Sequence, residues 1–139
     1  AVACESQTIA LPQGCTGVYL LAASAEGDRN AVFNAGSDVN VSVPYYSGFF
    51  GGGNWDEYKA FLKDGDVACV GGHRHDSRIR NEVYEHTYMF RIFVPVKAGA
   101  TELRLPADKA VTVFSATAVK AQHADAESVS DMVLHLERL

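Results

Sequence analysis

The stretch Thr87-Tyr-Met-Phe-Arg-Ile-Phe-Val-Pro-Val96 decides the fold class of this chain. Its side chains alternate between two faces, as the pleat of a β-strand requires. The two sets are Tyr88, Phe90, Ile92 and Val94 on one face, and Met89, Arg91 and Phe93 on the other. Pro95 has no amide hydrogen to give to a ladder, so we expect it near the strand's end or on an edge.

Further short strands are predicted on both sides of this one. In Val39-Asn-Val-Ser-Val43 the three valines share one face, which indicates a half-buried strand. The apolar run at 17–23 (GVYLLAA) is typical of a strand buried on both faces. Shorter strands are expected at 67–70, 102–105 and 111–119, with turns at 97–100 and 106–109. This spacing predicts an all-β fold, an antiparallel β-sandwich of jelly-roll or immunoglobulin-like type.

Two segments carry helical signals instead. Asn54 can cap a short helix over Trp55–Lys63, with acidic residues in its first turn. Near the C-terminus, apolar residues recur at i, i+3, i+4 and i+7; they are Val129, Met132, Val133 and Leu136. We therefore expect a sandwich domain over 1–122 and an amphipathic helix or linker over 123–139. That helix either packs on its own sandwich or docks on a neighbouring domain or subunit.

Size and charge limit the function classes. A chain of 139 residues with 47% hydrophobic content supports one domain. Its net charge of −5 leaves no basic patch for nucleic acid, and no apolar run reaches the roughly 18 residues of a membrane span. The start AVACESQ has neither a Met nor a leader, so we expect a fragment of a longer protein. Net charge and cysteine count leave the compartment undecided, with a periplasmic or extracellular place favoured over the cytoplasm.

The cysteines give no redox or zinc signature. Cys4, Cys15 and Cys69 are odd in number and form no CxxC pair. We expect buried or free thiols, while a Cys4–Cys15 bridge stays open as an alternative.

The most polar part of the chain is His73-Arg-His-Asp76, which begins a stretch that we expect to be a loop ending at Glu82. In one interpretation His73, Arg74, His75 and Asp76 brace this loop through hydrogen bonds to one another, to Glu82 or to the backbone. In another they face a ligand.

A metal site is the alternative interpretation of the same block. On a strand, His73 and His75 would share one face and could chelate a divalent metal, with His86 as a further ligand. A cupin-like metal enzyme would add Glu82 or Glu85. However, cupins have a Glu four or five positions after the second His, where this chain has Ile and Arg, and the second cupin motif is absent. We therefore expect no metal or other cofactor.

Aromatic residues give a third candidate. Tyr46, Trp55 and other rings cluster within fourteen positions around Gly51–Gly53, and sugar rings stack on such side chains. We predict Trp55, Asp56 and Tyr46 as ligand-binding residues. No nucleophile elbow, phosphate loop or dinucleotide motif is present, so we name no catalytic residue.

Several pieces of the sequence are similar to a known family. They are Leu11-Pro12 with GVYLLAASAEGD, then VSVPYYSG from Val41, DVACVGGHRHD, and NEVYEHTYMFRIFVPVKAGATELRLPADKAVTVFSATAV. Together they resemble the C-terminal β-sandwich domain of bacterial glycoside hydrolases of the family 38 α-mannosidase type. In that family the catalytic residues lie in a separate N-terminal region. The resemblance therefore implies a non-catalytic accessory module that contacts glycan or the catalytic domain of its parent; a protein-interaction module is the other alternative.

Overall fold

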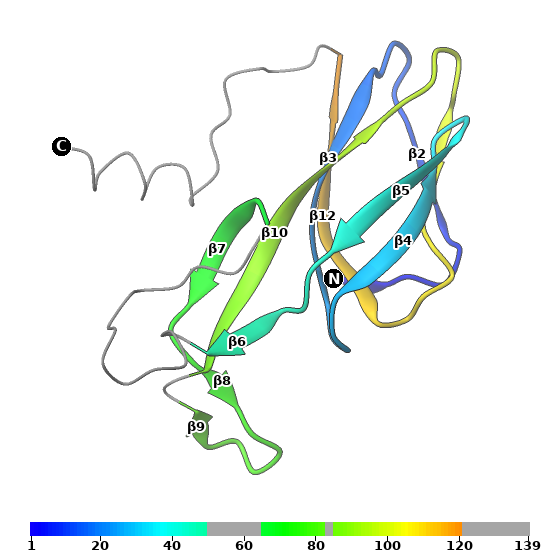
Figure 1. Ribbon diagram of the computed structural model, residues 1–139. Coiled ribbons are helices and arrows are strands. Elements are labelled where there is room, and N and C mark those ends of the chain that lie inside the picture. Colours follow the sequence, from blue (N-terminus) through cyan, green and yellow to red (C-terminus); the bar gives the residue numbers. More distant parts are fainter. Residues whose placement is uncertain (50–64, 83–84, 121–139) are drawn as a thin grey trace, which may run out of the picture.

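The computed structural model describes residues 1–49, 65–82 and 85–120, and these residues form two main sheets and a small third one (Figure 1). The larger sheet has the order β1 (Val2–Ala3), β12 (Val111–Val119), β3 (Gly17–Ser24), β10 (Glu85–Pro95) and β6 (Ser47–Phe49). Strand β7 (Val67–Gly71) pairs with the edge of β10 opposite to β6, because Thr87 is partnered by both Ser47 and Gly71.

The smaller sheet has the order β2 (Thr8–Ala10), β11 (Glu102–Arg104), β4 (Arg29–Asn34) and β5 (Asp38–Val43). A separate hairpin pairs β8 (Arg74–His75) with β9 (Asn81–Glu82). Every strand ladder in the described part of the chain is antiparallel, so the predicted antiparallel β-sandwich is confirmed. Among these residues no helix is long and apolar enough to cross a membrane.

The core lies between the two main sheets. The largest fully buried side chains come from both, and include Leu20 of β3 and Phe90 of β10 on one side, with Phe33 of β4 and Leu103 of β11 on the other. Burying an aromatic or leucine side chain is worth about 1.5–3 kcal/mol. Apolar burial between the sheets is therefore the main source of the body's stability.

Strand β10 has the alternation that its sequence predicts. Tyr88, Phe90, Ile92 and Val94 are buried, whereas the side chains between them are only partly covered. Pro95 is the last residue of the strand, as expected. The valines at 39, 41 and 43 likewise share the covered face of β5, with the polar residues between them exposed. Side chains in these segments thus alternate between buried and more exposed positions, and the buried face of each sheet points to the shared core.

Some expectations from the sequence need correction, and others lie outside the described residues. The segment from His73 to Glu82 is a short hairpin instead of a loop, because β8 and β9 pair in register. The helices expected over 55–63 and within 123–139 lie outside the described residues, and the described residues contain no helix. Cys4, Cys15 and Cys69 are free, so the alternative bridge between Cys4 and Cys15 is not formed.

Candidate functional site

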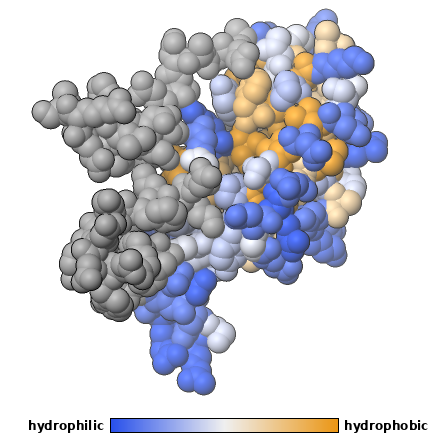
Figure 2. Space-filling model, viewed as in Figure 1, coloured by the Kyte–Doolittle hydropathy of each residue, from blue (hydrophilic) through white to orange (hydrophobic). Residues whose placement is uncertain are grey.

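The β8–β9 hairpin carries the polar block, and it projects from the sandwich as a hydrophilic arm (Figures 1 and 2). Its register sets Arg74 opposite Glu82 and His75 opposite Asn81. The turn between the strands includes Ile79, which has a φ of 61° and is 79% exposed. A positive φ is unusual for a β-branched residue, so other contacts must hold this turn.

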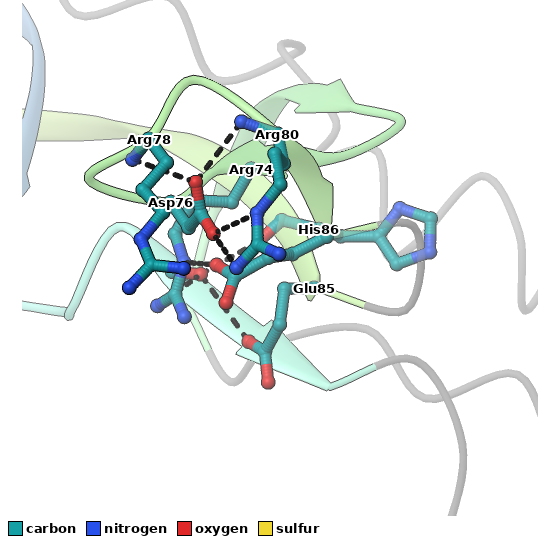
Figure 3. A network of polar contacts seen from close by, with 8 residues as sticks. Arg74, Asp76, Arg78, Arg80, Glu85 and His86 are labelled. Carbon is teal, nitrogen blue, oxygen red and sulfur yellow. Dashed lines mark hydrogen bonds and ion pairs between the residues drawn. The ribbon is translucent and has the colours of Figure 1, made fainter.

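Asp76 supplies those contacts. Its Oδ1 accepts hydrogen bonds from the backbone amides of Arg78 (2.8 Å) and Arg80 (3.0 Å), and its Oδ2 accepts one from Arg80 Nε (2.9 Å; Figure 3). The backbone amide of Asp76 also donates to the Arg80 carbonyl. The hydrogen bonds from the Arg80 amide and guanidinium lower the pKa of Asp76 below its ordinary value. Asp76 is therefore charged and engaged within its own turn.

Arg74 anchors the hairpin to the larger sheet. Its Nε donates to Glu82 Oε2 at 2.6 Å, and its Nη1 donates to the Ser47 hydroxyl of β6 at 3.3 Å. The Glu82 contact raises the pKa of the guanidinium. Ser47 is almost fully buried and also donates to the carbonyl of His86, so the anchor reaches β10. Arg74 thus joins the hairpin to two strands of the body.

The two histidines of the block lie together, away from these contacts. The Nε2 atoms of His73 and His75 are 2.9 Å apart, and the two rings are stacked with centroids 4.9 Å apart. His86 does not join them in the described contacts; its Nδ1 lies 3.2 Å from the Gly71 carbonyl, and Figure 3 shows its ring pointing away from the Asp76 network. No group of three or more potential metal ligands occurs in the described ranges.

A second candidate site is a hollow on the outer face of the larger sheet, with a volume of about 490 Å³. It lies over β3, β7, β10 and β12. Its walls combine rings, small side chains and hydroxyls, and they are formed by Ala23, Ser24, Ala25, Tyr46, Cys69, Gly71, Thr87, Tyr88, Met89, Thr112 and Phe114. The volume falls in the range of about 300–1,000 Å³ typical of small-ligand pockets.

Small side chains shape the wall of this hollow. Ala23 presents only a methyl group to it, and Gly71 lets the Thr87 hydroxyl pack against its Cα, because a Cβ at position 71 would collide with that hydroxyl. Phe114 lies at the register shift between Val113 and Ser115 of β12 and is 44% exposed. Its ring therefore stands at the rim, where it can meet a ligand.

The sequence-predicted site residues divide between these places. Tyr46 lines the hollow, whereas His73, Arg74, His75 and Asp76 lie on the hairpin and do not line it. Trp55 and Asp56 lie outside the described residues. Sequence reasoning missed the rest of the lining, including the hydroxyls of Thr87 and Thr112 and the apolar side chains of Met89 and Phe114. A usable signal for them is that 17–23 is apolar on both faces, which indicates that the outer face of this sheet also carries apolar contacts.

Fold and geometry define the class: an antiparallel β-sandwich module with an apolar hollow on one outer face and a polar hairpin beside it. The chain belongs to the family described as the AziU2-like beta-sandwich domain, whose family model matches residues 1–122. The β-sandwich that the α-mannosidase resemblance implied is thus confirmed, while the match shows no link to glycoside hydrolase family 38. The search of curated proteins found no match.

Proposed function

We propose that this domain is a non-catalytic binding module and that the hollow on its outer face receives a carbohydrate. The observation that carries the proposal is the lining of the hollow. Tyr46 and Phe114 provide rings on which the apolar face of a sugar can stack, and Thr87 and Thr112 provide hydroxyls among them. Mostly apolar walls with a few polar groups are what small-ligand sites require.

The polar hairpin supports a non-catalytic role for two of the predicted site residues. Arg74 and Asp76, the charged members of the block, already have partners. Arg74 donates hydrogen bonds to Glu82 and Ser47, and Asp76 accepts one from Arg80, at distances of 2.6–3.3 Å. A carboxylate held charged by three hydrogen-bond donors is a poor general acid, because its proton is lost far below neutral pH. Their contacts favour bracing the hairpin over chemistry on a substrate.

The resemblance to family 38 hydrolases supplies the finer form of the proposal. In that form the module belongs to a carbohydrate-active enzyme of α-mannosidase type, and it contacts the glycan or the catalytic domain of its parent. α-Linked mannobioses are therefore the first probes. Ligand-observed NMR with the purified chain should detect saturation transfer to the mannobiose.

Two substitutions in the hollow test its role. Phe114→Ala removes a rim ring and Thr112→Val removes a hydroxyl at constant shape; each should weaken binding by roughly five- to tenfold, as loss of about 1 kcal/mol predicts. Val32→Ala is the matched control, since Val32 is 45% exposed but does not line the hollow. Mannobiose binding that is equal in all four proteins, or absent from the unchanged chain, would overturn the proposal.

A further inference from the structure

We propose that His73 and His75 form a bidentate site for Cu²⁺ on the outer side of the β8–β9 hairpin. The site is independent of carbohydrate binding in the hollow, because neither histidine lines that hollow. It also differs from a cupin centre, since the glutamates that the cupin alternative would use are engaged elsewhere: Glu82 binds Arg74, and Glu85 lies 3.4 Å from the Ser47 hydroxyl.

The distance between the Nε2 atoms of His73 and His75 fits a metal centre with 90° angles better than a tetrahedral one. With metal–nitrogen bonds of about 2.05 Å, two nitrogens 2.9 Å apart subtend roughly 90° at a shared metal ion. A tetrahedral centre would need them about 3.35 Å apart at the same bond length. An angle near 90° belongs to adjacent positions of square-planar, tetragonal and octahedral centres, and among the divalent ions that imidazoles bind in such positions Cu²⁺ has the highest affinity.

The backbone that carries the pair is fixed on both sides. Arg74, the residue between the two histidines, directs its side chain to Glu82 and Ser47. His73 immediately precedes β8 and His75 is its last residue, and side chains alternate along extended chain, so both imidazoles lie opposite the Arg74 side chain, where their Nε2 atoms meet. Asp76 locks the turn that follows through its contacts with Arg78 and Arg80. Little ordering is therefore needed for the pair to chelate, and a preorganised pair loses less free energy on binding.

The protonation of the pair is compatible with a metal ligand role. At a contact of 2.9 Å between two ring nitrogens, one Nε2 donates its hydrogen and the other accepts. Binding of Cu²⁺ requires both Nε2 lone pairs, so the ring that donates in this contact must bind the metal as its Nδ1–H tautomer. Both rings are exposed, which leaves the remaining coordination positions open to water or to a group from another molecule.

The test uses the full chain without a polyhistidine tag and with Cys69→Ser, because Cys69 is an exposed thiol that would itself react with copper. Cu²⁺ is titrated and followed by calorimetry and electron paramagnetic resonance. We expect one Cu²⁺ per chain, an axial spectrum with coupling to two nitrogens, and affinity higher than that for Zn²⁺ in competition.

Three variants decide which residues bind. His73→Gln and His75→Gln should each weaken Cu²⁺ affinity by about tenfold or more, and the double variant should lose the site. His135→Gln is the control and should bind as the unchanged chain does. Circular dichroism of each variant checks the fold, which exposed imidazoles are not needed to maintain. Absence of a saturable single site, or equal affinity in the double variant, would overturn the proposal, and neither result bears on mannobiose binding.

Discussion

The sandwich body and the β8–β9 hairpin are stabilised by opposite kinds of interaction. In the body, side chains such as Phe33 and Phe90 are at most 1% exposed and pack against other apolar groups. In the hairpin, Ile79 is 79% exposed and the backbone is held by directed polar contacts to Asp76 and Arg74. The body should therefore respond to lost volume, and the hairpin to lost charge.

The largest expected effect is on the core of the body. Phe33→Ala should lower the free energy of unfolding by about 3–5 kcal/mol, because Phe33 is fully buried between the sheets. Urea denaturation followed by circular dichroism measures this loss. Phe114→Ala removes the same ring from a position that is 44% exposed, and it should cost about 1 kcal/mol or less. Equal losses in the two variants would show that Phe33 is not a core residue.

The second effect is a loss of folding stability at high pH, and it arises in the body and not in the hairpin. Burial, followed by the nearby charge of Asp108, raises the pKa of the Cys4 thiol from 9.0 to about 11. A raised folded-state pKa means that the stabilisation is complete below pH 9 and is lost as the pH rises toward 11. The free energy of unfolding should fall by up to about 1.4 kcal/mol per pH unit in this window.

A Cys4→Ala variant provides the comparison for this alkaline loss. It has no thiol at position 4 to ionise, so the part of the loss due to Cys4 should disappear, while Cys69→Ser should keep it. Urea denaturation at pH 8, 9, 10 and 11 gives the measurement. A Cys4→Ala curve parallel to that of the unchanged chain would contradict the assignment to Cys4.

The smallest effect is local to the hairpin and lies at the acid side. The pKa of Asp76 is lowered from 3.8, so its contribution is present above about pH 4 and is lost as the pH falls through the lower folded value. Asp76→Ala should raise amide exchange rates at Arg78 and Arg80 roughly five- to tenfold at neutral pH, as loss of one or two net hydrogen bonds predicts.

Hydrogen exchange by NMR distinguishes this local change from unfolding. Exchange in β10 should stay as in the unchanged chain, because the core strand does not depend on the turn. Asp38→Ala, a change in the β4–β5 turn, should leave Arg78 and Arg80 protected. If Asp76→Ala instead exposes the amides of β10, the hairpin and the body are one cooperative unit.

The fold was more predictable from the sequence than the candidate sites. The alternation in β10 follows directly from the pleat, so the amino-acid sequence alone is enough to name its buried set. The hairpin was not predicted, because hydrogen bonds from Asp76 determine its turn and a polar composition does not reveal them. The hollow was not predicted, and Tyr46 is the one residue of its lining that the sequence marked as a candidate, since Phe114, Cys69 and Tyr46 come from separate segments that only the fold brings together.

The pairing of Gly71 with Thr87 has a consequence for how this domain can vary in length. The chain leaves the larger sheet after Gly71 and re-enters it at Glu85 of β10, two residues before Thr87, which is the partner of Gly71 on the adjacent strand. Because both ends of the excursion are fixed close together, residues can be added or removed between Gly71 and Glu85 without shifting the registers of β10 against β7 and β6. Doubling the length of a flexible loop costs only about 0.6 kcal/mol. The arm is thus a natural position for insertion or replacement of a recognition element on an unchanged sandwich.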